Sequence, residues 1–518
     1  MEPLSKKVFL TLTPPTEEDA RSDIQRILDA IGEPATVALS VLREVYPMLP
    51  RSDWKVTATL SWEGEHWHLI RLEPGNTTAC HYGVAVDLGS TTVCMELIDL
   101  NSGAVVCRDS AYNHQIAFGE DILTRVFYAK DDGEKLEQIR TATLESFREV
   151  LEQLQEHSGI PVDEYTAMVV SGNTTMMHFF LGLDAFVIFA SPYAPHATSF
   201  DFYCASELGL PQRGYVYCVP CRANYLGGDI LSGMVATGLP EGEEIKVFLD
   251  IGTNGELVVG NRHFLLCGAG AAGPALEGGV VKTGMRAVDG AVSTVTLKEG
   301  KYHLTTIGGA APRGICGSGI VDLIATLFLN GKLDRLGKFR PEASGVTCKD
   351  GEWGVYYAPG LFFGQMDVDE FLRTKAAANT MVEYILEYAG IPMEQVASFF
   401  VAGAFGTHLD KESAVTIGLY PDLPREQIIS AGNSSLEGAA QILRDRSHID
   451  KIQGYLSNME YIQFGEVANF VHLMNAAMAL PHTDLSRYPS VQAKLEKEKT
   501  HEAERDAGGS SAPAISKR

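Results

Sequence analysis

The sequence contains no long apolar run. No stretch approaches the roughly 20 consecutive apolar residues that a membrane-spanning helix needs, so a membrane partner is not expected. The first residues, MEPLSKKVFLTLTPPTEED, also lack the uninterrupted apolar core of a signal peptide, because their short apolar stretch leads directly into acidic residues. We therefore expect a cytoplasmic protein.

Positive charge is scarce as well. The 518 residues include 42 Lys and Arg against 66 Asp and Glu, which gives a formal net charge of −24. Because nucleic acids and anionic membranes are bound through basic patches, neither is expected as the main partner. With 45% hydrophobic and 21% charged residues, the composition is that of a globular protein with several domains.

Cysteine is sparse and scattered. Nine residues, an odd number, are typical of free thiols in a reducing cytosol rather than of a disulfide framework. Cys218 and Cys221 form a single CxxC pair, whereas a metal or iron–sulfur site normally needs four ligands. Two such pairs from two subunits would supply four, but buried thiols at a strand end are the interpretation we favour. An iron–sulfur cluster is therefore not expected in this chain.

Residues 1–80 have the pattern of a small α+β domain. KVFLTL predicts a strand, and residues 24–31 show the apolar spacing of one helix face. A second helix is predicted to end at Tyr46, before Pro47, and WKVTATLSWEGEHWHLIRLE alternates like a β-hairpin. This segment carries no chemical motif.

A strand that ends in an aspartate, and is followed by a turn that contains glycine, occurs twice in the sequence. YGVAVD leads into Leu-Gly-Ser-Thr-Thr and the strand VCMELID, and IKVFLD leads into Ile-Gly-Thr-Asn and the strand GELVVG. Asp87 and Asp250 lie 163 positions apart (250 − 87). This matched pair predicts two duplicated lobes, over 81–240 and 241–486, with the C-terminal helices able to return to the first lobe. The charged, then Gly/Ser/Ala-rich tail, 487–518, is expected to be disordered or a frayed helix.

The two turns have the residue types that bind a nucleoside triphosphate and its metal. Glycine lets the backbone approach a ligand closely, and neighbouring amides and hydroxyls donate to phosphate oxygens. A carboxylate cannot bind phosphate, but it can hold Mg2+ through water, so we expect this role of Asp87 and Asp250. The predicted phosphate ligands are Gly89, Ser90, Thr91 and Thr92 in the first turn and Gly252, Thr253, Asn254 and Gly255 in the second. Glu256, just after the second turn, is either a catalytic residue that positions a lytic water or a solvated strand residue.

This doubled arrangement resembles the superfamily of actin, sugar kinases, acetate kinase and the seventy-kilodalton heat-shock chaperones. The resemblance implies an α/β fold of two ribonuclease-H-like lobes (the actin-like ATPase fold), with ATP and Mg2+ in the cleft between them. The superfamily's third motif, an apolar strand that enters a glycine turn at the nucleoside, matches SFFVAGAFGTHL. Its predicted binding residues are Gly403, Ala404, Phe405 and Gly406, and a connecting helix is expected over 375–389.

Longer stretches resemble one family in particular. NHQIAFGEDILTR, VVSGNTTMMHFFLGL, AGAAGPALEGGVVKTGMRAVDGAV, GICGSGIVDLIA and GNSSLEGA are similar to the ATPase region of the reductive activators of corrinoid proteins, and residues 1–80 resemble that family's small middle domain. The resemblance implies ATP-dependent return of an oxidised Co(II) corrinoid protein to its active Co(I) state, by a homodimer.

Members of this family usually carry an iron–sulfur module with closely spaced cysteines, whereas the first cysteine here is Cys80. We therefore expect an external electron donor, such as a ferredoxin, and a corrinoid protein as the partner. Two alternatives stay open: a metabolite kinase on the same fold, and an ATP-driven activator whose iron–sulfur cluster is shared between subunits.

Overall fold

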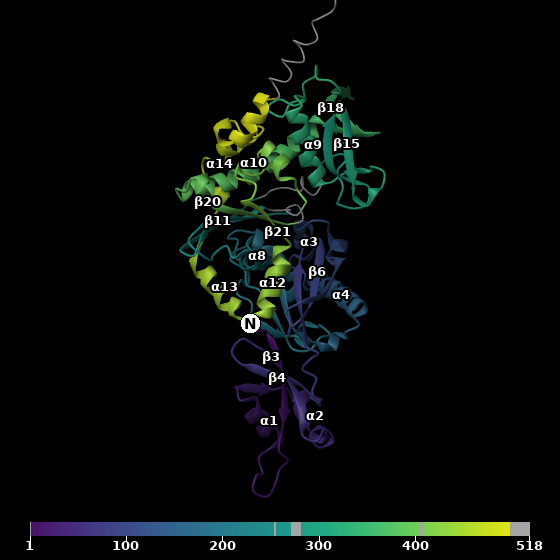
Figure 1. The fold of residues 1–518 in the computed structure, drawn as a ribbon, viewed down its shortest axis with the longest axis vertical. Helices are drawn as coiled ribbons and strands as arrows, with labels where there is room; N and C mark the ends of the chain where they lie inside the picture. The colour runs from purple at the N-terminus through teal and green to yellow at the C-terminus, as the bar shows by residue number, and fades with distance from the viewer. Residues whose placement is uncertain (1, 253–254, 271–280, 404–407, 498–518) are drawn as a thin grey trace, which may run out of the picture. The chain divides into compact units, whose positions relative to one another are not determined.

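The computed structural model describes residues 2–252, 255–270, 281–403 and 408–497. The chain divides into two compact units (Figure 1). The first unit holds residues up to 240 together with 433–459, and the second holds 241–432 and the residues from 460 onward. Among the helices of the described ranges, none is both long enough and apolar enough to cross a membrane.

The first unit begins with a four-stranded sheet that has its own core. The sheet order is β1 (Ser5–Thr11), β3 (Lys55–Trp62), β4 (Trp67–Pro74), β2 (Ala35–Val37). Helices α1 (Asp23–Ile31) and α2 (Leu39–Arg51) join its apolar cluster. The structure has the predicted strand, hairpin and first helix. However, α2 is interrupted at Tyr46 and Pro47 and then resumes, because the fully buried Leu49 anchors its second part in this core.

A six-stranded sheet follows in the first unit. Its order is β7 (Val105–Tyr112), β6 (Thr92–Asp99), β5 (Tyr82–Leu88), β8 (Tyr165–Gly172), β10 (Tyr215–Cys218), β9 (Phe202–Cys204). The first three strands along the chain form an antiparallel meander, and β8 and β10 extend the sheet in parallel.

The second unit repeats this topology. Its sheet order is β21 (Ile428–Gly432), β20 (Val396–Ala402), β11 (Ile245–Ile251), β12 (Gly255–Asn261), β13 (Phe264–Gly270), β22 (Met459–Ile462). Strands β11 to β13 form the antiparallel meander, and β20 and β21 add in parallel. Strands β7, β6, β5, β8 and β10 of the first unit thus correspond in order and direction to β13, β12, β11, β20 and β21 of the second. This repeat confirms the predicted α/β fold with two ribonuclease-H-like lobes.

Helices surround both sheets. Those of the first unit are α3 (Ile122–Ala129), α4 (Gly133–Ser158), α5 (Thr174–Leu181), α6 (Phe186–Phe189), α7 (Ala205–Leu208), α8 (Gly228–Thr237), α12 (Ser434–Arg444) and α13 (Ser447–Asn458). Those of the second are α9 (Gly317–Leu329), α10 (Gln365–Tyr388), α11 (Lys411–Ile417) and α14 (Phe470–Ala477). The second unit also has two small sheets, one of β14 (Ala291–Lys298), β15 (Lys301–Thr306) and β16 (Gly314–Ile315), the other of β17 (Thr347–Lys349), β18 (Glu352–Ala358) and β19 (Leu361–Gly364).

Strand β5 has α4 on one face and α12 on the other. Side chains alternate between the two faces of a strand, and Val84 and Leu88 belong to the apolar cluster that α4 helps to form. On the other face, a Cβ at Gly83 would lie 3.1 Å from the side chain of Leu443 in α12. Asp87 lies on the same face as Gly83, so its carboxylate is directed toward α12. Figure 1 shows that α12, which comes late in the chain, lies among elements from much earlier in the sequence.

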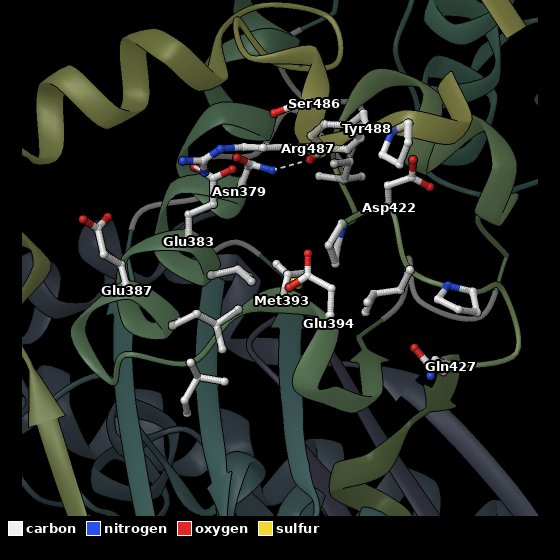
Figure 2. A pocket seen from close by; sticks show the side chains of 18 residues that line it. Asn379, Glu383, Glu387, Met393, Glu394, Asp422, Gln427, Ser486, Arg487 and Tyr488 are labelled. Atoms are coloured by element: carbon white, nitrogen blue, oxygen red, sulfur yellow. Dashed lines mark hydrogen bonds and ion pairs between the residues drawn. The ribbon is translucent and has the colours of Figure 1, made fainter. Parts of the chain in front are cut away.

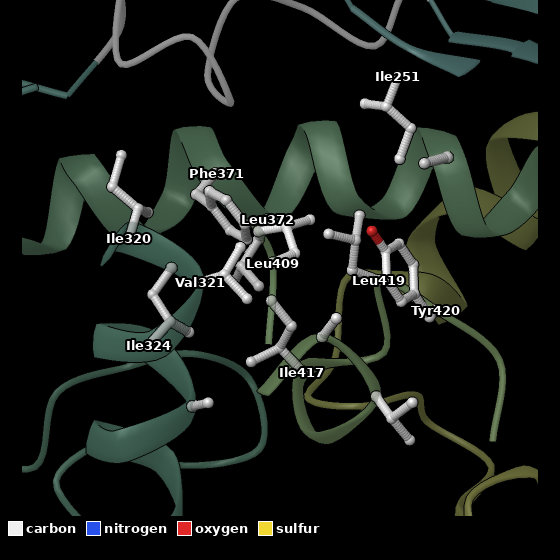
Figure 3. Packing of buried hydrophobic residues seen from close by; sticks show 14 of the residues in the cluster. Ile251, Ile320, Val321, Ile324, Phe371, Leu372, Leu409, Ile417, Leu419 and Tyr420 are labelled. Atoms are coloured by element: carbon white, nitrogen blue, oxygen red, sulfur yellow. The ribbon is translucent and has the colours of Figure 1, made fainter. Parts of the chain in front are cut away.

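The core of the second unit forms where α9, α10 and residues 409–420 meet (Figure 3). Phe371 and Leu372 of α10 lie beside Val321 of α9 in this core. The connecting helix expected over 375–389 is thus the later part of α10, which already begins at Gln365.

The C-terminal part of the chain contributes to both units. Residues 433–459, which we assigned to the second lobe with the option of a return, lie in the first unit. For the tail from residue 487, which we expect to be disordered or a frayed helix, the structure describes residues up to 497, and residues 489–497 are helical. Tyr488 and Val491 are buried in the second unit, so apolar anchors outweigh the charged composition there. Residues 498–518 lie outside the described part.

Candidate functional site

The turn between β5 and β6 presents hydroxyl groups that a ligand can reach. β5 ends at Leu88 and β6 begins at Thr92. A Cβ at Gly89 would lie only 2.6 Å from the carbonyl oxygen of Thr92, so the turn requires glycine at this position. The hydroxyls of Ser90, Thr91 and Thr92 are half-buried and form no hydrogen bond within the described residues. They are free to donate to phosphate oxygens.

Buried donors hold the carbonyl groups of the same turn. Asn113 Nδ2 donates to the carbonyl of Gly89 at 2.9 Å, and Arg125 Nη1 donates to that of Ser90 at 2.6 Å. The backbone N–H of Asn113 donates to the carbonyl of Thr91 at 2.9 Å. In a trans peptide the N–H points opposite to the C=O of the same peptide. The N–H groups of Ser90, Thr91 and Thr92 belong to these three peptides, so they point away from the buried donors. Successive amides directed this way form an anion-binding concavity.

Asp87 is hydrogen-bonded at the N-terminal end of α12. Ser435 Oγ donates to Asp87 Oδ1 at 2.8 Å, and Asn433 Nδ2 donates to Oδ2 at 2.9 Å. Ser435 Oγ also lies 2.9 Å from Ser171 Oγ at the end of β8. Burial raises the pKa of Asp87, and the bonds from Ser435 and Asn433 counter this by lowering it. Because a carboxylate has about four acceptor positions, both oxygens can still accept from water bound to a metal.

In the second unit, Asp250, Glu256 and Gly403 come together at the ends of three strands. Asp250 is directly opposite Glu256 in the β11–β12 pair, so the two side chains lie on one face of the sheet. A Cβ at Gly403 would lie 2.5 Å from the carbonyl oxygen of Ile251 and 2.8 Å from Asp250 Oδ1. Gly403 also has a φ of 88°, so glycine is required where the β20 turn passes Asp250.

Asp87 and Asp250 have matching places in their own sheets. Each precedes the last residue of the strand that is followed by the glycine turn. Gly252 directly follows β11, and Gly255 begins β12. The remaining predicted ligands lie outside the described residues: Thr253, Asn254, Ala404, Phe405 and Gly406.

Four residues of the site were not assigned from the sequence: Asn113, Arg125, Asn433 and Ser435. Each lies in a stretch that carries the family resemblance, NHQIAFGEDILTR or GNSSLEGA. Local spacing gives no sign of their role, because Asn433 and its partner Asp87 are separated by 346 positions.

The two cysteines of the CxxC pair pack in the core of the first unit. Cys218 and Cys221 are both buried in its apolar cluster. Burial raises the pKa of both thiols, that of Cys221 to about 12, whereas a metal ligand must be the thiolate. Across the described ranges, no three or more His, Cys, Asp or Glu side chains are grouped as a metal site would require.

A cavity of about 690 Å3 lies in the second unit, at the C-terminal part of α10 (Figure 2). Val382 and Leu386 give it an apolar wall, and Glu383 pairs with Arg487 at 2.8 Å. None of the predicted nucleotide ligands that the structure describes lines it. This cavity is therefore not the predicted nucleotide site.

Three sequence models of one family match consecutive parts of the chain. They are described as the RACo linker region (residues 1–79), the RACo middle region (82–242) and the C-terminal domain of RACo, the ASKHA domain (244–492). Residues 1–80, which we compared with the family's middle domain, thus match the linker model, and the middle-region model matches the first ribonuclease-H-like lobe.

Named relatives agree with this match. The chain is 33% identical over 377 residues to the corrinoid activation enzyme RamQ of Eubacterium limosum, a match that covers 69% of this chain and 63% of that protein. It is 22% identical over 409 residues to a [Co(II) methylated amine-specific corrinoid protein] reductase of Methanosarcina barkeri, covering 72% of this chain and 71% of the relative.

A solved structure covers nearly the whole chain. It is a reductive activator for corrinoid, iron–sulfur protein, with 35% sequence identity and a TM-score of 0.86, and the match covers 95% of this chain and 81% of the other. The chain belongs to the RACo family, the reductive activators of corrinoid proteins.

Proposed function

We propose that this protein uses ATP and Mg2+ to drive the reduction of a corrinoid protein from Co(II) to Co(I). The cobalt gains one electron from an external iron–sulfur donor such as a ferredoxin, which is oxidised by one electron. ATP and water give ADP and phosphate in the same cycle. The names of the relatives, a corrinoid activation enzyme and a Co(II) corrinoid protein reductase, support this substrate class.

The observation that carries the ATP part of the proposal is the β5–β6 turn. It combines accessible hydroxyls at residues 90–92, amides directed away from buried donors, and the carboxylate of Asp87 beside them. In the second unit, Asp250 and Glu256 share one face of the sheet beside Gly403. We assign the binding of Mg2+, through water, to Asp87 and Asp250, and the binding of phosphate to the two glycine turns. The turn at Gly403 is assigned to the nucleoside. Glu256, together with Asp250, is assigned to the positioning of the lytic water.

Mg2+, when bound, neutralises phosphate charge and orients the phosphate for attack by water. The protein contributes position and hydrogen bonds. ATP and ADP are expected to stabilise the protein's conformations to different extents, and thus to differ in binding free energy between those conformations. This difference in binding free energy is what can be coupled to an otherwise unfavourable electron transfer. We also propose that the protein works in the cytoplasm as a homodimer.

Visible absorption of the corrinoid tests the proposal. The full chain is incubated with a Co(II) corrinoid protein, reduced ferredoxin, Mg2+ and ATP, and the Co(I) spectrum is followed against samples without ATP or without ferredoxin. Co(I) that appears only when both are present supports the proposal. Reduction at the same rate without ATP, or a phosphorylated metabolite as the product, overturns it. Iron analysis of the same protein tests for a cluster shared between subunits through Cys218 and Cys221.

A further inference from the structure

Arg125 is a fully buried cation directly behind the predicted phosphate turn. Its side chain is 0% exposed, and all its hydrogen-bond acceptors are neutral oxygens. Besides the carbonyl of Ser90, they are the carbonyl of Gly119 at 2.8 Å, the carbonyl of Glu120 at 3.3 Å and Gln115 Oε1 at 3.2 Å. Within the part of the chain that the structure describes, no carboxylate lies at ion-pair distance from this guanidinium: burial lowers the pKa of Arg125, and the more distant charge of Asp121 counters this only in part.

A buried charge is costly unless an opposite charge lies close by. The carbonyls around Arg125 satisfy its donors but do not balance its charge, which Asp121 balances only in part. The Ser90–Thr91 peptide separates the guanidinium from the outer side of the turn, toward which the Thr91 amide points. An anion bound to that amide would lie on the axis of the same peptide dipole.

The Ser90–Thr91 peptide also carries the electrostatic effect of Arg125 to the outer side of the turn. A charged donor on a carbonyl polarises the peptide and strengthens the N–H at its other end as a donor. The strongest effect is therefore expected on an anion held by Thr91 N–H, and a nucleotide phosphate is the anion that the proposed function places at this turn.

The guanidinium is fixed in place by a second buried side chain. Gln115, also 0% exposed, accepts from Arg125 and donates through Nε2 to Thr143 Oγ1 of α4 at 2.6 Å. Arg125 itself lies on α3. The cation is therefore held between α3, α4 and the turn rather than free to swing toward solvent.

We propose that Arg125 is the positioning residue of the phosphate site, and that the phosphate chain of the nucleotide supplies negative charge that balances this buried cation beyond the partial effect of Asp121. The inference rests on the proposed ATP binding. It assigns to Arg125 the preference for nucleotides with more phosphate groups, because an added negative charge near the turn is stabilised by the cation behind it.

Nucleotide affinity as a function of phosphate number tests this inference. The full chain and the variants Arg125→Met and Arg125→Lys are titrated with ATP, ADP and AMP, each with Mg2+, and their thermal unfolding is recorded without nucleotide. Arg125→Met is expected to weaken ATP binding by about 10-fold or more and AMP binding much less, because the lost interaction is with phosphate charge. Arg125→Lys, which keeps the charge, is expected to retain most of the preference for ATP over AMP.

Arg140→Met is the matched control. Arg140 lies in the same unit, and its guanidinium also donates to a backbone carbonyl, that of Leu208 at 2.9 Å. Its removal is expected to leave the ratio of ATP to AMP affinity unchanged.

The nucleotide affinities of these variants distinguish an electrostatic role of Arg125 from a purely structural one. If Arg125→Met weakens the three nucleotides equally or not at all, the inference is overturned while ATP binding stands. If that variant does not fold, Arg125→Lys decides: loss of the ATP preference in a folded protein that keeps the charge contradicts the inference. If the unchanged protein binds no nucleotide, the proposed function fails, and the inference fails with it.

Discussion

Asp87 and Asp250 occupy the same place in two copies of one fold, but their surroundings differ. Asp87 accepts hydrogen bonds from Asn433 and Ser435 on both carboxylate oxygens. Asp250 lies opposite a second carboxylate, that of Glu256. A carboxylate fixed by two donors suits a constant electrostatic task such as holding metal-bound water, and a pair of carboxylates suits the polarisation of an attacking water. We therefore expect the duplicated position to have divided into two roles.

Asp87→Asn tests the first role. The variant has the same shape but lacks the negative charge, and its amide group cannot accept hydrogen bonds on both terminal atoms. ATP hydrolysis is expected to fall by about 100-fold, since one preorganised charge or donor at a reacting site is typically worth that much. A steady-state ATPase assay over a range of Mg2+ concentrations measures the loss.

The exposed Asp163 provides the control for this substitution. Asp163→Asn changes the net charge by the same amount, so it is expected to leave hydrolysis unchanged. Equal activity of Asp87→Asn and the unchanged protein would contradict the assignment of Asp87 to the metal.

Helix α12 comes from a late part of the chain, yet it supports Asp87 near the start of the first lobe. It packs so closely on α8 that a Cβ at Gly438 would lie 1.9 Å from the carbonyl oxygen of Ser232. The same helix begins with the residues that hold Asp87. The separation of the two helices should therefore affect both the stability of the first unit and the position of this carboxylate.

Gly438→Ala is expected to force α12 away from α8. Overpacking of this kind destabilises a protein by about 1–3 kcal/mol, and ATP affinity is expected to fall because Asn433 and Ser435 move with the helix. Thermal unfolding and nucleotide titration measure the two effects. Gly454→Ala, in α13 of the same unit, is the control, because a Cβ there would meet nothing within 4 Å. Similar losses in both variants would show that the α8–α12 contact is not the cause.

His81 joins the small N-terminal sheet to the first lobe. It is 3% exposed, and its Nε2 lies 3.0 Å from Ser5 Oγ, which donates to Thr166 Oγ1 at 2.7 Å. Burial, with a smaller contribution from the charge of Lys7, lowers the pKa of His81 from 6.5 to about 4. The side chain is therefore neutral in the folded protein at pH values where the unfolded chain already binds a proton.

The folded protein is expected to lose stability as the pH falls from about 6.5 to 4, by about 2–3 kcal/mol from this group alone. The sign follows from the unfolded state, which binds more protons than the folded state in this range. His81→Gln removes the titrating group, so the unfolding temperature of this variant should depend less on pH. His66→Gln, at a more exposed position, serves as the control. The same pH dependence in all three proteins would contradict the role of His81.

The elements that the sequence predicted correctly are those set by local pattern. The alternating strands before Asp87 and Asp250 and the helix of residues 24–31 are examples, because side-chain periodicity determines them within a few residues. The predicted stop of the second helix at Tyr46 corresponds to the interruption of α2 at Tyr46 and Pro47, but its resumption up to Arg51 was not predicted, because it accompanies the burial of Leu49 in the core. The support of Asp87 by residues 433–435 was missed because it depends on a contact between distant parts of the chain, which no local pattern contains.

The chain does not complete the first unit before it begins the second. Residues 1–240 supply most of the first unit, and residues 433–459 return to it before the chain completes the second unit with residues 460 onward. The returning segment covers the face of β5 that carries Gly83 and Asp87. Duplication of the fold therefore did not produce two independent consecutive domains, and the site carboxylate of the first unit is supported by residues that interrupt the second.

A fragment of residues 1–240 is therefore expected to fold poorly. It lacks α12, whose Leu436, Ile442 and Leu443 are at most 1% exposed in the complete chain. Each buried side chain of this size contributes about 1.5–3 kcal/mol, so their loss is comparable to the whole stability of a domain, about 5–15 kcal/mol. The same fragment joined to residues 433–459 by a flexible Gly/Ser linker should recover a cooperative thermal transition and near-ultraviolet circular dichroism. A linked fragment with Leu436→Asp and Leu443→Asp should not, because its helix can no longer bury that face. If residues 1–240 alone unfold cooperatively at the same temperature as the linked fragment, the first unit is complete without the returning segment, and the dependence of Asp87 on it is limited to two hydrogen bonds.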